Sequence, residues 1–177
     1  MEIVFVTSNP NKVREVEEIL GMKVKQVSID VKEIQSLDVK DVVREKVIEA
    51  YKIVNKPVIV EDTGLYIESL NGFPGALIKW VMKTIGNEGI CRITTGDRRA
   101  VARTYVGYYD GNDLNLFVGE ISGRISDVPR GDGFGWDAVF IPDEYEKTFG
   151  ELGPEIKNKI SMRKIAFEKL RNYLKQE

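Results

Sequence analysis

Several acidic residues follow short apolar runs, and their chemistry suggests a metal site. Glu33 follows VSIDVK, and Glu61 and Asp62 follow the apolar run PVIV. Mg2+ prefers oxygen ligands, and it combines one or two protein carboxylates with water and phosphate oxygens. Successive strand residues point to opposite faces, so Glu61 and Asp62 can enter one cleft only if the strand has ended. Gly64 predicts such a turn; the alternative is that these carboxylates simply mark strand ends in water.

A polar segment, VTSNPNK (residues 6–12), joins a short apolar run to a stretch with helical spacing of apolar residues. It predicts a strand-to-helix loop. A helix N-terminus favours an anion, and a phosphate there would reverse the unfavourable position of Lys12 in the first turn. The alternative is an ordinary helix start, capped by Asn9 or Asn11, with Lys12 in solvent.

The glycine-rich segment GDGFGWD (residues 131–137) is a candidate base-binding loop. Its glycines allow the backbone to approach a ligand closely. Phe134 and Trp136 offer flat faces on which a nucleobase can stack, for about 1–3 kcal/mol per base. The alternative is a hydrophobic plug beneath a flexible loop.

A basic segment, KNKISMRK (residues 157–164), opens the last predicted helix. Arg163 could donate two hydrogen bonds to a purine O6 and N7, the geometry by which arginine reads guanine. A 6-amino group would meet that donor with another donor, so adenine would be disfavoured. Alternatively, the charges are a solvated helix face.

Composition narrows the class of protein. The 177 residues carry 26 basic and 28 acidic side chains, a net charge of −2, which argues against partners such as nucleic acid or a membrane surface. No apolar run reaches the roughly 18 residues of a membrane span. The chain has no histidine, so proton transfer falls to carboxylates, lysine, tyrosine or metal-bound water. The single cysteine, Cys91, permits no intrachain disulfide, and we expect a cytoplasmic protein.

The order of elements predicts an α/β fold with a long mixed central sheet, flanking helices and a cleft between two lobes. Residues 1–177 are expected to form a single domain. Residues 99–128 read as two long strands joined at DGND, a hairpin covered on both faces. The other predicted elements are helices at 13–20, 38–54, 76–86 and 161–177, and strands at 23–29, 57–60, 65–70 and 138–141.

Five segments carry a family resemblance. In chain order they are TSNPNK, EDTGLYIESLNGFPGALIKW, PRGDGFGWDAVFIPD, EKTFGEL and KNKISMR. Together they closely resemble the inosine triphosphate pyrophosphatase family, from Val4 to about Arg171. The resemblance implies a two-lobed α/β fold, commonly a homodimer. It also implies Mg2+-dependent hydrolysis of ITP, XTP and their deoxy forms to the monophosphate and pyrophosphate, which removes deaminated purines from the nucleotide pool.

The resemblance also assigns roles to residues. It implies that Glu33 and Asp62 bind metal and activate water, and we add Glu61 as a helping metal ligand. Asp62 and Lys12 are the predicted catalytic residues. The predicted substrate contacts are Thr7, Ser8, Asn9, Lys12, Lys46, Thr63, Gly64, Phe134, Gly135, Trp136, Asp137, Lys157, Ser161, Met162 and Arg163.

Two residues depart from the family pattern. Ser8 stands where the family usually reads TGN, a mild change if its φ is negative and a strained one otherwise. Met162 stands where the family usually reads SHR, and a thioether cannot donate a hydrogen bond to a base. Met162 also lies on the apolar stripe of the last helix, so it is alternatively a core residue.

Three other functions compete with this prediction. A nucleotide-sensing module without catalysis is opposed by the complete acidic set, and a pyrophosphatase for modified pyrimidines by the aromatic loop and Arg163. A nucleic-acid binder is opposed by the balanced charge.

Overall fold

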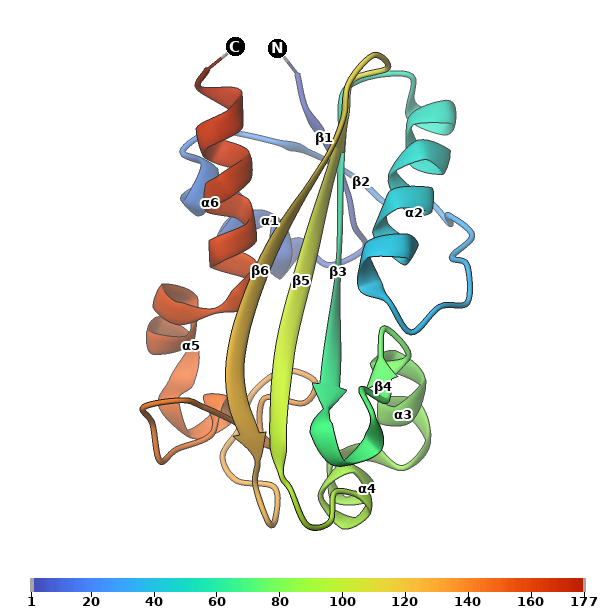
Figure 1. Ribbon diagram of the computed structural model, residues 1–177. Helices are drawn as coiled ribbons and strands as arrows, with labels where there is room; N and C mark the ends of the chain where they lie inside the picture. The colour runs from blue at the N-terminus through green and yellow to red at the C-terminus, as the bar shows by residue number, and fades with distance from the viewer. Residues whose placement is uncertain (1, 177) are drawn as a thin grey trace.

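The computed structural model describes residues 2–176, in which seven strands form one sheet with the order β2-β1-β3-β5-β6-β7 and β4 paired to β3 (Figure 1). Their bounds are β1 Val4–Val6, β2 Lys25–Val27, β3 Val58–Ile67, β4 Pro74–Gly75, β5 Arg99–Tyr109, β6 Leu114–Ile125 and β7 Phe140–Pro142. The β1 strand pairs in parallel with β2 and β3, and the other pairs are antiparallel. The predicted mixed sheet and the long hairpin are confirmed.

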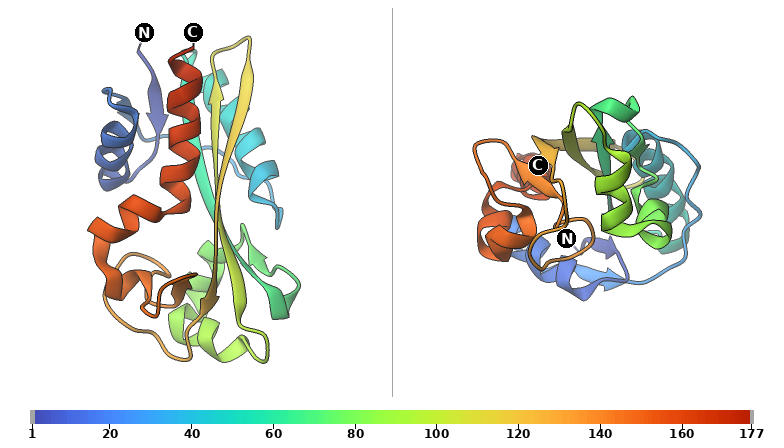
Figure 2. Two further views of the ribbon diagram at one scale, coloured as in Figure 1. Left: turned by 60° about the vertical axis from the view of Figure 1, so that its left-hand side comes forward. Right: turned by 90° about the horizontal axis from the view of Figure 1, so that it is seen from below.

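Helices cover both faces of this sheet (Figures 1 and 2). They are α1 Pro10–Leu20, α2 Val39–Val54, α3 Ile78–Thr84, α4 Gly86–Ile93, α5 Phe149–Ile160 and α6 Met162–Leu174, with a short 3-10 turn, η1, at Glu68–Leu70. One face of β1 and β3 packs against α2, and the opposite face packs against α1 and α6. None of the helices found between residues 2 and 176 has the length and hydrophobicity needed to cross a lipid bilayer.

Two lobes share the long strands. In the upper lobe of Figure 1, two apolar clusters lie on opposite faces of the sheet, one under α2 and one under α1 and α6. In the lower lobe a third cluster joins the far ends of β3, β5 and β6 to α3, α4 and the start of α5. Because β3, β5 and β6 run through both lobes, they set the position of one lobe relative to the other.

Local sequence explains where the first two helices begin and end. Asn9 caps α1 by accepting a hydrogen bond from the Asn11 backbone N–H, Pro10 occupies the first turn, and Gly21 ends the helix in a left-handed conformation. Asp38 caps α2 in the same way, through the Lys40 N–H.

The predicted turn at Gly64 is wrong, because β3 continues to Ile67 and pairs residue by residue with β5. The glycine is needed for a different reason. A Cβ at position 64 would lie 2.6 Å from Val39 Cγ2 and 3.0 Å from the Gly75 carbonyl carbon. Gly64 therefore lets the start of α2 and β4 approach the strand closely.

Other element boundaries also differ from the prediction. The strand predicted at 23–29 is observed only as β2, at Lys25–Val27, and the strand predicted at 138–141 is observed as β7, at Phe140–Pro142. The predicted 76–86 helix corresponds to α3 alone, and Gly86, with φ +63°, starts a further helix, α4, that was not predicted. The α5 helix was not predicted. Residues 157–164, predicted to open the last helix, instead span its end and the start of α6: Lys157 lies in the last turn of α5, and Ser161 is the N-cap of α6.

Candidate active site

Two adjoining cavities hold most of the predicted site residues. The larger, of about 690 Å³, lies between α1 and residues 132–158, and the smaller, of about 440 Å³, lies over the ends of β1 and the middle of β3. Asn9, Lys12 and Phe134 line both, so the two cavities meet at these residues. Each is within the size range of small-molecule sites.

The loop before α1 forms the junction between the cavities. Thr7 Oγ1 accepts a hydrogen bond from the Asn9 backbone N–H at 3.1 Å. Asn9 is the N-cap, but Lys12 is not in solvent, because its Nζ lies 2.6 Å from Glu61 Oε1. Ser8 does not adopt a positive φ, so its replacement of the family glycine is the mild change.

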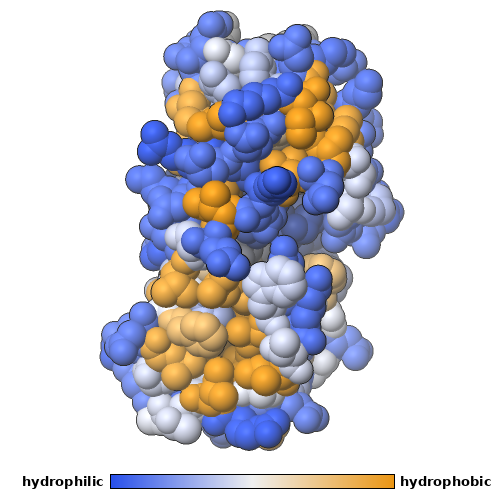
Figure 3. Space-filling model, turned by 90° about the vertical axis from the view of Figure 1, so that its right-hand side faces the viewer, coloured by the Kyte–Doolittle hydropathy of each residue, from blue (hydrophilic) through white to orange (hydrophobic). Residues whose placement is uncertain are grey.

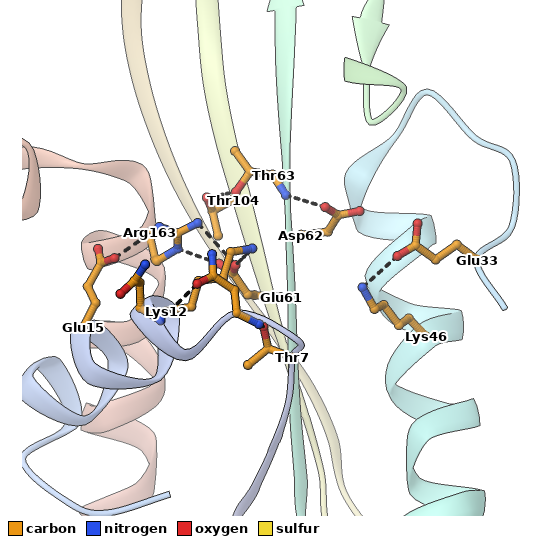
Figure 4. A network of polar contacts seen from close by, with 12 residues as sticks. Thr7, Lys12, Glu15, Glu33, Lys46, Glu61, Asp62, Thr63, Thr104 and Arg163 are labelled. Carbon is orange, nitrogen blue, oxygen red and sulfur yellow. Dashed lines mark hydrogen bonds and ion pairs between the residues drawn. The ribbon is translucent and has the colours of Figure 1, made fainter. Parts of the chain in front are cut away.

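The two neighbouring acids of β3 point to opposite faces of the sheet (Figure 4). Glu61 faces α1 and α6, where it pairs with Lys12 and with Arg163 Nε at 2.8 Å. Asp62 faces α2 and the loop that carries Glu33, and its Oδ1 accepts a hydrogen bond from the Thr63 backbone N–H.

Charges in the smaller cavity perturb one another. Burial raises the pKa of Asp62, and the Glu33 carboxylate adds to this shift while Lys46 opposes it. Burial also opposes ionisation of Glu33, but Lys46 at 2.8 Å and Lys79 at 3.2 Å outweigh it and lower the pKa of Glu33. The cavity is lined by four carboxylates and three lysines, namely Asp30, Glu33, Glu61, Asp62, Lys12, Lys46 and Lys79. This charge pattern is suited to a cation and a polyanion bound together.

Glu61, predicted as a helping metal ligand, lines the smaller cavity with Glu33 and Asp62, but it is paired with Lys12 and Arg163. Burial opposes ionisation of Glu61, but Arg163 and Lys12 outweigh it and hold the pKa of this carboxyl well below its ordinary value. Both of its oxygens are engaged on the face away from Asp62. Within residues 2–176, no three His, Cys, Asp or Glu side chains gather as a metal site. Glu33 and Asp62 remain as a pair.

The two aromatic residues of the predicted base-binding loop lie in different environments. Phe134 is 69% exposed and lines both cavities. Trp136 instead packs edge-on against Phe140 and joins the lower-lobe core, so the plug alternative is right for Trp136. Asp137 orders the loop, because it accepts hydrogen bonds from the Phe134 N–H at 3.1 Å and from Lys157 Nζ at 2.9 Å.

Several predicted substrate contacts do not reach either cavity. Ser161 is buried as the N-cap of α6, and Met162 is 4% exposed within the lower-lobe core. The Gly135 carbonyl accepts a hydrogen bond from Asn87 Nδ2 instead. The predicted contacts that line neither cavity are Gly64, Gly135, Trp136, Ser161 and Met162; those that line one or both are Thr7, Ser8, Asn9, Lys12, Lys46, Thr63, Phe134, Asp137, Lys157 and Arg163.

This arrangement agrees with comparisons to known proteins. The sequence pattern of the Ham1 family matches residues 3–173. The chain belongs to the Ham1 family. It is 42% identical to a dITP/XTP pyrophosphatase of Methanopyrus kandleri, over 99% of this chain and 97% of the relative. It is 41% identical to an inosine triphosphate pyrophosphatase of Yarrowia lipolytica, over 100% and 97%. The predicted resemblance is confirmed.

A solved Ham1 structure supports the fold as well. The HAM1 protein from Coxiella burnetii superposes with a TM-score of 0.86 at 27% identity, covering 100% of both chains. The α/β fold with its long mixed sheet is therefore that of Ham1 proteins.

Two residues of this Ham1 site were missed by the sequence prediction. Lys79, on α3, lines the smaller cavity and pairs with Glu33. Glu15, on α1, lines the larger cavity and accepts a hydrogen bond from Arg163 Nη1 at 3.2 Å. Glu15 could have been suspected, because it lies three residues after Lys12 and so on the same helix face. Lys79 had no such signal, since it reads as an ordinary surface lysine beside Trp80.

Proposed function

We propose that residues 1–177 act as one nucleoside triphosphate pyrophosphatase domain for non-canonical purines. The expected substrates are ITP, dITP and XTP, and the expected products are the nucleoside monophosphate and pyrophosphate. The observation that carries the proposal is the junction of a cavity lined by four carboxylates and three lysines with a larger cavity bearing an exposed aromatic ring. Removal of deaminated purines from the nucleotide pool is the proposed role.

The two cavities suit the two ends of such a substrate. In the smaller cavity Lys12, Lys46 and the N-terminus of α1 would neutralise the triphosphate. In the larger cavity Phe134 would stack on the base. Arg163 uses three of its N–H groups on Glu61 and Glu15, which leaves two donors for a 6-keto purine.

Mg2+ is the proposed cofactor, and Glu33 and Asp62 would hold it. Both line the smaller cavity, and the Glu33 carboxylate adds to the burial that raises the Asp62 pKa, an unfavourable pairing that a divalent cation would relieve. When bound, Mg2+ would supply charge neutralisation and phosphate orientation. Asp62 would orient or deprotonate the attacking water.

Product analysis tests this function. ITP, XTP, GTP and ATP are incubated in parallel, with and without Mg2+, and pyrophosphate is separated from orthophosphate. We expect monophosphate and pyrophosphate from ITP and XTP only with Mg2+, and much faster than from GTP or ATP. Equal rates on all four nucleotides would contradict the proposed base selectivity. Release of orthophosphate instead of pyrophosphate would show that a different phosphoanhydride bond is cleaved.

A substitution at Glu33 tests the cofactor. Glu33→Gln should raise the Mg2+ concentration needed for half-maximal rate on the order of tenfold or more, because it removes one ligand charge. The matched control is Glu120→Gln, on β6, which removes a carboxylate paired with Arg103 outside both cavities. Equal Mg2+ dependence in both variants would exclude Glu33 as a ligand.

We also propose a cytoplasmic homodimer. Figure 3 shows apolar side chains gathered on the lower part of one face, and the exposed apolar residues of the lower lobe include Phe73, Trp80 and Ile85. A contiguous exposed apolar surface suits a protein interface. Sedimentation velocity tests the dimer, and fractionation of the source cells tests the location.

A further inference from the structure

We propose that Glu61 is a positioning residue that fixes Lys12 and Arg163 relative to each other at the junction of the two cavities. The inference rests on the proposed function, because its readout is nucleotide turnover. It gives Glu61 a role different from that of Asp62, its neighbour in β3.

One carboxylate serves two cations from two helices. Glu61 Oε1 lies 2.6 Å from Lys12 Nζ and accepts a hydrogen bond from Arg163 Nη2 at 3.3 Å. Glu61 Oε2 accepts a hydrogen bond from Arg163 Nε at 2.8 Å. Lys12 comes from the first turn of α1 and Arg163 from the first turn of α6, so Glu61 joins three elements that are distant in the sequence (Figure 4).

The surroundings of Glu61 hold its side chain in place. The Glu61 side chain is 1% exposed, against 26% for Lys12 and 12% for Arg163. Glu61 itself lies in the middle of β3, which is hydrogen-bonded to β5 along its whole length. The most buried of these three side chains thus holds the other two, which line the cavities.

The two cations face different parts of the proposed substrate. Arg163 lines the larger cavity, where the base would lie, and Lys12 lines both cavities. Because Glu61 touches both, it sets the distance between the group proposed to read the base and the group at the junction. Only a nucleotide whose base engages Arg163 would then present its phosphates correctly to Lys12.

Charge gives the proposal a distinctive signature. Lys12, Arg163, Glu61 and Glu15 together carry no net charge, and Glu61→Gln would make the group positive. A polyanion should then bind as well as before or better, while Lys12, no longer held, is misplaced for turnover. Structural damage would instead weaken binding and turnover together.

The experiment compares Glu61→Gln with the Glu120→Gln control. The measurements are kcat and KM for ITP, the inhibition constant of inorganic tripolyphosphate, the Mg2+ concentration for half-maximal rate, and the melting temperature. For Glu61→Gln we expect kcat to fall about 10- to 100-fold, since small misplacements near reacting groups have effects of this size. Tripolyphosphate inhibition should be unchanged or tighter, and the Mg2+ dependence should stay that of the wild type.

Two further variants test the side-chain length of Glu61 and the position of Arg163 separately. Glu61→Asp keeps the charge and shortens the side chain, so it should fold if Glu61→Gln does not, and it should lower kcat without tightening tripolyphosphate inhibition. Glu15→Gln loosens Arg163 alone. It should reduce the preference for ITP over ATP, and because it also makes the group positive, tripolyphosphate inhibition should be unchanged or tighter.

Three results would overturn the proposal. One is wild-type kcat in both Glu61 variants. Another is a shift in Mg2+ dependence like that of Glu33→Gln, which would make Glu61 a metal ligand. The last is weaker tripolyphosphate inhibition accompanying the loss of kcat. If the wild type itself releases no pyrophosphate from ITP, the proposed function fails first, and that outcome is distinct from the other three.

Discussion

Replacing Met162 by Ala should destabilise the protein without changing which base it prefers. The side chain is 4% exposed in the lower-lobe core, and its backbone lies so close to β6 that a Cβ at Gly119 would collide with the Met162 carbonyl oxygen. Truncating a buried methionine costs about 2–5 kcal/mol. For a chain of this length each kcal/mol lowers the melting temperature by about 2–4 °C, so a loss of roughly 4–20 °C is expected.

The control is Met162→Leu, which keeps most of the volume and should cost less than about 1.5 kcal/mol. Thermal unfolding is followed by circular dichroism, and the rates on ITP and ATP are measured well below the melting temperature of each variant. We expect the ratio of the two rates to be the same in the wild type and in both variants. A changed ratio with an unchanged melting temperature would refute the reasoning and make Met162 a base contact.

Three further variants or probes test other parts of the structure. Asp62→Asn should lower turnover about 10²–10⁴-fold while nucleotide binding remains measurable by calorimetry. In EDTA it should also be more stable than the wild type at pH 7, because burial raises the pKa of Asp62 and ionising it in the folded state is unfavourable. This advantage should grow as the pH rises from 3.8 through the raised pKa, and a difference in melting temperature that does not change with pH would contradict it. Gly64→Ala should cost about 1–3 kcal/mol in denaturant unfolding, since its Cβ would overlap Val39, and unaltered stability would show that α2 can move away. Burial raises the pKa of the Cys91 thiol, so at pH 8 it should react with a disulfide reagent far more slowly than free cysteine and at the ordinary rate once unfolded; rapid labelling of the folded protein would disprove its burial.

The elements with complete local signals could be predicted from the sequence. The α1 helix has its cap at Asn9, its apolar spacing and its stop at Gly21, and the β5–β6 hairpin has its turn residues. The start of the α5 helix has a signal that was overlooked, the capping box of Thr148 and Glu151, but Gly153, with φ +81°, and Pro154 interrupt the helical pattern that would follow it. Gly64 has no local signal, since the residue that requires a glycine there, Val39, is 25 positions away.

The residue types of the site could be predicted better than their directions. Strand alternation already places Glu61 and Asp62 on opposite faces, and only the mistaken turn at Gly64 put them together. Two other predicted site residues pack into the core. They are Trp136 and Met162, which were predicted as substrate contacts. The apolar stripe of the last helix already offered this outcome for Met162, whereas nothing in the local sequence distinguishes Trp136 from Phe134.

The pairing register of β3 with β5 also determines which acidic residue lies on which face of the sheet. Glu61 pairs opposite Val106 and Asp62 opposite Tyr105, within a run of ten paired positions. Slipping β3 by one residue would exchange the faces of the two acids, which would send the shorter aspartate to Lys12 and Arg163 and the longer glutamate to Glu33. Insertions or deletions between Val58 and Asp62 would therefore exchange the sides of the two acids in the candidate site rather than merely displace them, so this short stretch should tolerate substitutions more readily than changes in length.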